Sequence, residues 1–126
     1  MHRDMRLRRR EEFSAVHRRG RSWANALLVL RVLPNGLARS RVGFSISKRV
    51  GKAVVRNQIR RRLREAVRAL PPRGGNDVVV IARGPAARAD YHRLLASLRA
   101  LLLAARLLTP VPVAPEGGRP RAVEDV

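Results

Sequence analysis

The run from about Val54 to Leu70 is amphipathic and ends abruptly. At about 100° per residue of a helix, its apolar side chains fall within one arc of roughly 100°. These side chains are Ile59, Leu63, Ala66, Val67 and Leu70. Pro71 and Pro72 follow directly, and proline cannot donate the backbone hydrogen bond that a continuing helix needs. The pattern predicts a helix with one face against a core and the opposite side free.

Basic side chains occupy the arc next to this apolar face, over roughly 140° of the helix. They are Arg56, Arg60, Arg61, Arg64 and Arg68, and Asn57 lies among them. We call these six residues the arginine stripe. Arginines four residues apart repel one another by a few tenths of a kcal/mol per pair. The preceding loop adds Lys48, Arg49 and Lys52. Because guanidinium groups bind phosphate in a two-point geometry, this placement favours a contact with phosphates over an ordinary solvated face.

The charge of the whole chain agrees with a polyanionic partner. It has 28 Lys and Arg against 9 Asp and Glu, a formal charge of +19. Nucleic acid is the first candidate partner and an anionic membrane surface the second. An aromatic content of 3% disfavours the membrane alternative. The longest apolar run, LLASLRALLLAARLL, is interrupted by Arg99 and Arg106 and is shorter than the roughly 20 residues of a membrane span.

The absence of cysteine excludes disulfides and thiolate sites, and it fits a reducing compartment. We therefore expect a cytoplasmic protein. GKAVVRN does not complete a nucleotide-binding loop, because Ala53 follows Lys52 where Ser or Thr is needed. No His or carboxylate spacing predicts a zinc site, so we expect no metal on the protein. The adjacent Glu11 and Glu12 point apart on a helix and make a poor acid–base pair, so we expect no catalytic residues.

Further elements are predicted on both sides of the amphipathic helix. A short helix from about Arg8 to Arg19 is closed by Gly20, and a strand is expected over 28–33, with a shorter one near 21–24. The alternation in Ser40 to Ser47 predicts a strand that pairs with 28–33 as a hairpin across Pro34-Asn35-Gly36.

The second half of the chain adds a strand and a helix. The apolar run from Asn76 to Ala82 is typical of an interior strand. Asp90 is the expected N-cap of a last helix that reaches about Leu108. We expect one α+β domain over 1–108, a small sheet packed against helices, and an unpacked Pro/Gly-rich tail over 109–126.

Three segments together resemble the bacterial ribonuclease P protein subunit: RLRRREEFSAVHRRGRS, RVGFSISKRVGKAVVRNQIRRRLREAVR and DVVVIAR. The resemblance covers about Arg6 to Leu108. It implies a two-layer α-β-β-β-α-β-α sandwich with a small mixed sheet and a left-handed β-α-β crossover, as in the second domain of ribosomal protein S5. Such crossovers are otherwise nearly always right-handed.

The resemblance also implies a function. In this family a large RNA subunit holds the Mg²⁺ ions that activate water for cleavage of precursor tRNA. The protein binds that RNA subunit and the 5′ leader of the substrate, and we expect it to be monomeric by itself, with no membrane partner. The alternative is a ribosomal-type structural RNA-binding protein, which would need the same charge and fold class.

The family's RNA-binding residues fall on most of the arginine stripe and on the loop before it. They correspond here to Lys48, Arg49, Lys52, Arg56, Asn57, Arg60, Arg61 and Arg64, with Arg68 extending the row. Gln58 stands where the family commonly has arginine. Phe13 matches an aromatic residue of the family's leader cleft, although core packing is an equal alternative for it. His17 and Arg31 stand where that cleft often has a second aromatic and a tyrosine.

Overall fold

The computed structural model describes residues 6–108, and the tail predicted over 109–126 lies outside them. The elements are α1 (Arg10–Arg19), β1 (Arg21–Ala24), β2 (Leu28–Pro34), β3 (Arg41–Ser45), α2 (Ala53–Ala69), β4 (Asn76–Ala82), the 3₁₀ helix η2 (Gly84–Arg88) and α3 (Tyr91–Ala104). This order confirms the α-β-β-β-α-β-α prediction and adds η2, which the sequence patterns did not indicate.

The four strands form one mixed sheet in the order β1-β2-β4-β3. β2 pairs antiparallel with β4, and β3 pairs parallel with β4. The predicted hairpin between 28–33 and 40–47 is therefore wrong, because β4 lies between those two strands. The reason is burial: Val78, Val79 and Val80 are 0–1% exposed, so the most apolar strand takes the position with a neighbour on each side.

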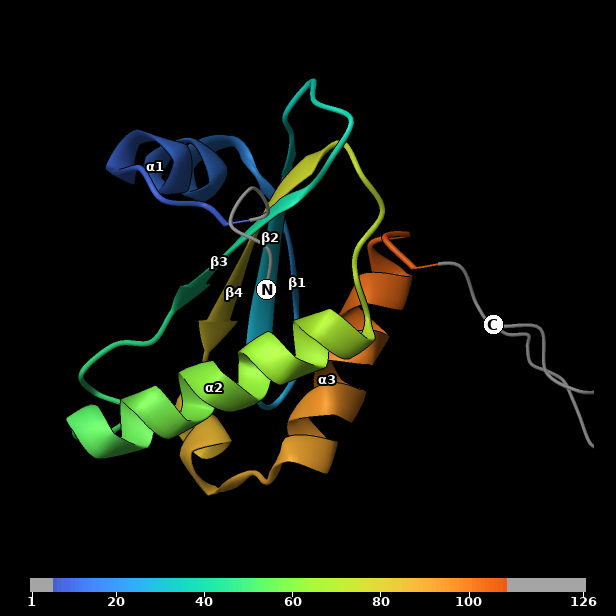
Figure 1. Cartoon of the computed structure of the whole chain (residues 1–126). Coiled ribbons are helices and arrows are strands. Elements are labelled where there is room, and N and C mark those ends of the chain that lie inside the picture. Colours follow the sequence, from blue (N-terminus) through green and yellow to red (C-terminus); the bar gives the residue numbers. More distant parts are fainter. Residues whose placement is uncertain (1–5, 109–126) are drawn as a thin grey trace, which may run out of the picture.

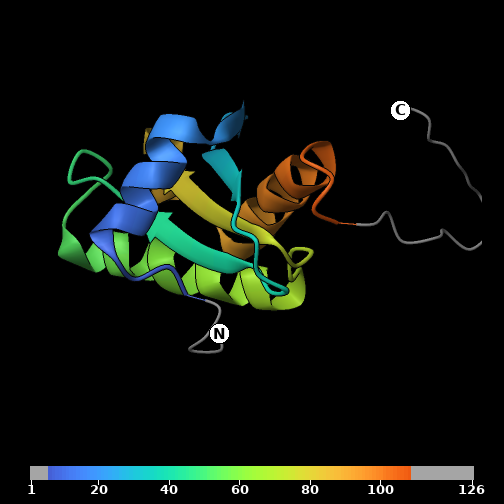
Figure 2. The same ribbon diagram turned by 90° about the horizontal axis from the view of Figure 1, so that it is seen from above.

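The helices cover the sheet unevenly. Figures 1 and 2 show α2 and α3 on one face and α1 on the other. In Figure 1, β3 and β4 both run downward, β3 lies to the left of β4, and α2 crosses in front of the sheet, which is the left-handed connection expected. Ile59, Leu63, Leu94 and Leu98 are fully buried under the first face. The opposite face has a smaller core of Leu7, Val16 and Val79.

Two helix ends differ from their predicted places. α1 begins at Arg10 rather than near Arg8, because the preceding residues pair with the edge strand: Leu7 donates its N–H to the Val42 carbonyl at 3.0 Å. α3 ends at Ala104 rather than at Leu108. Two residues after this end, Arg106 has a positive φ of 62°, which is incompatible with a continuing helix. Its start is as predicted, since the Asp90 side chain accepts the Arg93 N–H. In residues 6–108 no helix is long and apolar enough to span a bilayer.

Candidate nucleic-acid interface

The apolar face of α2 is buried as predicted, and the arginine stripe lies beside it. Ile59, Leu63, Ala66 and Val67 are at most 3% exposed. Within the stripe, Arg56, Arg60 and Arg64 are half-buried, and Asn57, Arg61 and Arg68 are exposed. Lys48, Arg49 and Lys52 are also exposed, in the turn that leads from β3 into α2.

Few of these charges are neutralised within the protein. Arg68 pairs with Glu65 at 3.3 Å, but the ion pairs found among residues 6–108 include no other member of the stripe. Arg56 donates through Nε to the Gly51 carbonyl at 3.1 Å, and Arg60 donates through Nη1 to Asn57 Oδ1 at 3.1 Å. These contacts orient the guanidinium groups without compensating their charge. The stripe therefore presents a row of cations suited to a row of phosphates.

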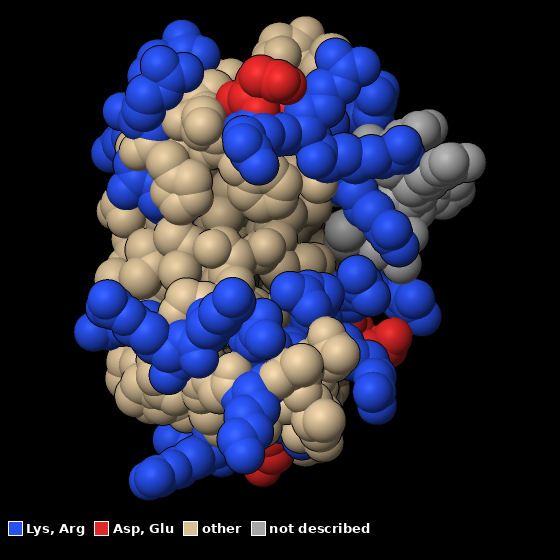
Figure 3. All heavy atoms as spheres, turned by 90° about the vertical axis from the view of Figure 1, so that its left-hand side faces the viewer, with Lys and Arg blue, Asp and Glu red and all other residues tan. Residues whose placement is uncertain are grey.

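A pocket of about 250 Å³ joins the stripe to the first helix at the outer edge of β3. Arg60 and Arg64 of α2 line one side of it, and Phe13 of α1 lines another. Arg6 and Arg8, from the segment before α1, complete the basic rim. We call this the Phe13 pocket. Figure 3 shows the same face with Lys and Arg gathered in two bands, over α1 and over α2, and an uncharged band between them.

The Phe13 ring is in close contact with the backbone of β3. A Cβ built on Gly43 would lie 2.4 Å from the ring atom Cζ, so the ring occupies the space that any larger residue would fill. Phe13 also packs against the core of Leu7, Val16 and Val79, and it stays half-buried. The two predicted roles of Phe13 are thus compatible: one part of the ring packs and another lines the pocket.

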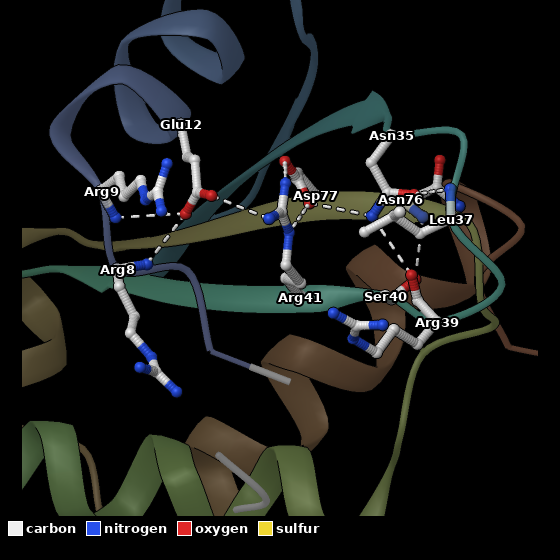
Figure 4. Close-up of polar contacts among 10 residues, drawn as sticks. All are labelled: Arg8, Arg9, Glu12, Asn35, Leu37, Arg39, Ser40, Arg41, Asn76 and Asp77. Carbon is white, nitrogen blue, oxygen red and sulfur yellow. Dashed lines mark hydrogen bonds and ion pairs between the residues drawn. The ribbon is translucent and has the colours of Figure 1, made fainter. Parts of the chain in front are cut away.

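Polar contacts fix the N-terminal end of α1 on the sheet (Figure 4). Glu12 Oε1 accepts the backbone N–H groups of Arg8 and Arg9, both at 3.1 Å, and Oε2 accepts Arg41 Nη1 at 2.8 Å. Arg41 in turn donates Nε and Nη2 to the two carboxylate oxygens of Asp77, at 2.8 and 2.7 Å. Helix, edge strand and central strand are therefore tied together through one guanidinium.

These contacts shift the acid–base equilibria of the residues involved. Burial alone would raise the pKa of Glu12, but the N–H groups of Arg9 and Arg8 and the charge of Arg41 hold that pKa below its ordinary value. The hydrogen bond to Asp77 is the main reason that the pKa of Arg41 lies above its ordinary value. Both groups are therefore charged at neutral pH.

A second strand arginine holds the other end of α1. Arg31 of β2 donates Nη2 to the carbonyl oxygens of His17, at 2.5 Å, and Gly20, at 3.2 Å, and Nε to that of Val16 at 3.4 Å. A cation at these carbonyls also complements the negative end of the helix dipole. The His17 side chain is exposed and lies outside the residues that line the Phe13 pocket. The leader-contact roles of His17 and Arg31 stay predictions.

Three basic residues of this region were not singled out from the sequence: Arg6, Arg8 and Arg41. The run RLRRR before α1 was the available signal for the first two. Arg41 had none, because its partners Glu12 and Asp77 lie 29 and 36 residues away along the chain. Within the described part of the chain, no cluster of three His, Cys, Asp or Glu side chains is placed to hold a metal ion.

The sequence model of the ribonuclease P family matches residues 1–106. This chain belongs to the ribonuclease P protein family. Among its relatives, the ribonuclease P protein component of Caldanaerobacter subterraneus subsp. tengcongensis is 45% identical over 98 residues, which are 76% of this chain and 84% of that protein. The component of Roseiflexus castenholzii is 49% identical over 105 residues, 81% of this chain and 86% of the relative.

Solved structures of ribonuclease P proteins have the same fold. The Staphylococcus aureus protein superimposes with a TM-score of 0.76 at 30% identity, over 83% of this chain and 98% of that one. The Thermotoga maritima protein, solved with 1-(4-fluorophenyl)-2-thiourea, gives a TM-score of 0.70 at 34% identity, over 77% and 96% of the two chains. The α+β architecture of this ribonuclease P protein is thus that of the family.

Proposed function

We propose that this chain is the subunit of bacterial ribonuclease P that binds the catalytic RNA and holds the 5′ leader of precursor tRNA in the cytoplasm. The observation that carries the proposal is the Phe13 pocket. There an aromatic ring and two arginines of the stripe, from elements far apart in sequence, line one cavity. Such a cavity suits a single-stranded nucleotide, whose base stacks on an aromatic face and whose phosphate binds guanidinium.

The proposal divides the work between two surfaces. The arginine stripe and the loop with Lys48, Arg49 and Lys52 bind phosphates of the RNA subunit and of the leader next to the cleavage site. The Phe13 pocket holds a leader nucleotide, and α1, fixed at both ends by Arg41 and Arg31, sets the position of the ring. Mg²⁺ ions held by the RNA subunit would supply the activated water, and the protein contributes binding and orientation only.

The test is a turnover assay at low Mg²⁺ with a bacterial ribonuclease P RNA, with and without this protein. Two substrates are compared: a precursor tRNA with an intact leader and one with a leader shortened to a single nucleotide. We expect the protein to stimulate cleavage at the mature 5′ end, more for the intact leader, and to cut nothing without the RNA. Cleavage by the protein alone would overturn the proposal.

Two variants accompany this test: one alters the Phe13 pocket, and the other is a control outside both surfaces. Phe13→Leu keeps the apolar packing but removes the aromatic face, so it is expected to reduce the advantage of the intact leader. Arg99→Ala removes an exposed arginine of α3 outside the proposed surfaces and is the matched charge control. No stimulation of a well-matched RNA subunit, together with co-sedimentation with ribosomes, would instead support the structural RNA-binding alternative.

A further inference from the structure

A second and larger pocket, of about 480 Å³, lies at the carboxyl ends of β3 and β4. Neighbouring parallel strands send their following loops out from the same sheet edge. The loop after β3 contributes Val50, and the segment after β4 contributes Pro85, Ala87 and Arg88. Arg93, in the first turn of α3, completes the rim. We call this the η2–α3 pocket; none of its lining residues lines the Phe13 pocket.

The pocket combines apolar walls with two uncompensated cations. Leu27 is buried, Val50 and Ala87 are half-buried, and Arg88 and Arg93 are exposed. Within residues 6–108 neither guanidinium makes a hydrogen bond or ion pair. Asp90 is the acidic residue between Arg88 and Arg93 in the sequence. Its Oδ1 accepts the backbone N–H of Arg93 at 2.9 Å and so caps α3.

Two other arginines nearby are used to build the pocket. Arg83 donates Nη1 to the Asn25 carbonyl at 2.7 Å, and Arg62 donates Nη1 to the Ala89 carbonyl at 3.1 Å. Arg62 belongs to α2, so this bond fixes the η2–α3 connection relative to the helix that carries the arginine stripe. Arg88 and Arg93 have no such structural task, and both are left at the mouth of a firmly held cavity.

We propose that the η2–α3 pocket is a further RNA contact, which takes an unstacked nucleotide of the ribonuclease P RNA subunit. Its base packs on the apolar wall, and its phosphates bind Arg88 and Arg93. The pocket adjoins the basic loop through Val50, so the contact continues the proposed RNA surface around the first turn of α2. We assign the RNA subunit rather than the leader because η2 and α3 contribute nothing to the Phe13 pocket. This inference rests on the proposed function.

The first experiment uses the absence of cysteine in the chain. A Cβ built on Gly84, a residue of the pocket rim, meets no atom within 4 Å, so Gly84→Cys introduces one thiol without a clash. The thiol is coupled to a photo-crosslinker, and the full-length protein is assembled with the RNA subunit and a precursor tRNA. Ala100→Cys, exposed on α3, carries the same crosslinker as the control.

We expect the Gly84→Cys protein to crosslink to a defined site of the RNA subunit and the control to give no such crosslink. Crosslinks to the leader alone would overturn the assignment to the RNA subunit. An active, labelled holoenzyme without any RNA crosslink from position 84 would overturn the contact itself.

The second experiment measures affinity for the RNA subunit against salt concentration. Arg88→Ala and Arg93→Ala are each expected to lower the slope of log K against log salt by about 0.7 to 0.9 and to leave the advantage of the intact leader unchanged. Arg99→Ala, on the same helix as Arg93, is the control. If Arg93→Ala has the same salt slope as Arg99→Ala while the wild-type protein binds the RNA subunit and stimulates cleavage, the η2–α3 contact is refuted and the proposed function stands. If the wild-type protein does not bind the RNA subunit, the proposed function fails with it.

Discussion

Arg41 and Asp77 form a two-point ion pair across the parallel strands β3 and β4, with donor–acceptor distances of 2.8 and 2.7 Å. The register places the two residues directly opposite each other. Because Arg41 also reaches Glu12 of α1, the pair does more than close a strand end: it determines where α1 lies on the sheet. The position of the Phe13 ring follows from that contact.

Arg41→Met is expected to lower the free energy of unfolding by about 2 to 3 kcal/mol. It leaves the Asp77 carboxylate, which still accepts Asn35 Nδ2, without its cation in a poorly solvated place. The Asp77 side chain is only 8% exposed, whereas that of Glu12 is 20% exposed, so most of the loss comes from Asp77. Urea unfolding measures the change, and Arg99→Ala should stay close to the wild type. An equal stability of Arg41→Met and wild type would show that the pair contributes nothing.

Stability should fall in acid partly through Glu12. Its folded pKa lies below the ordinary value of 4.5, so the unfolded state binds more protons near that pH. The contribution is present above the unfolded pKa and is lost as the pH falls through the folded one. Urea unfolding as a function of pH should therefore show a shallower acid loss for Glu12→Gln. Glu11→Gln, its exposed neighbour, is the control, and identical profiles of Glu12→Gln and wild type would refute the assignment.

Gly43→Ala should displace the Phe13 ring, because the added methyl group would lie 2.4 Å from Cζ. We expect a loss of about 1 to 3 kcal/mol of stability from overpacking and a smaller advantage of the intact leader. Gly84→Ala adds the same methyl group in open space and is the matched control. In the Gly43→Ala protein, adding Phe13→Leu should restore part of the stability but not the advantage of the intact leader. If the stability losses of the two substitutions simply add, direct contact between Gly43 and the Phe13 ring is refuted.

Arg60→Ala and Arg64→Ala should each weaken RNA binding and reduce the salt slope by about 0.7 to 0.9, while stability changes little. Titrations of the RNA subunit at several salt concentrations measure the slope. Arg99→Ala again controls for the loss of one charge. A slope identical to that of the wild type would exclude a phosphate contact at the substituted position.

Local signals in the sequence predicted the elements but not how the strands pair. The Asp90 cap, the short strand Arg21–Ala24 and the interior strand Asn76–Ala82 depend on neighbouring residues, and all three are confirmed. The pairing of β2 and β3 was predicted wrongly because a turn signal between two strands says nothing about a third strand that enters between them. Only the burial of the whole sheet decides that order.

The candidate site shows the same division: its local parts follow from the sequence, and its assembly does not. The arginine stripe follows from helical periodicity, and Figure 3 shows Lys and Arg side chains gathered over α2. The Phe13 pocket needs α1, β3 and α2 at one place, and no pattern along the chain contains that information. Arg31 is the one charged residue of the apolar strand LVLRVLP, which is visible in the sequence. That it donates hydrogen bonds to carbonyl oxygens at the end of α1 depends on tertiary contacts and is not.

The strand order also fixes when the domain can form during synthesis. β4 is the last strand to leave the ribosome, yet it separates β2 from β3, so β3 has no neighbour within the sheet until residue 82 has been made. The arginine-rich helix is translated before that strand and has no complete sheet to cover until then. A nascent chain of this protein must therefore carry its most basic segment without its full packing partner until the central strand has been made.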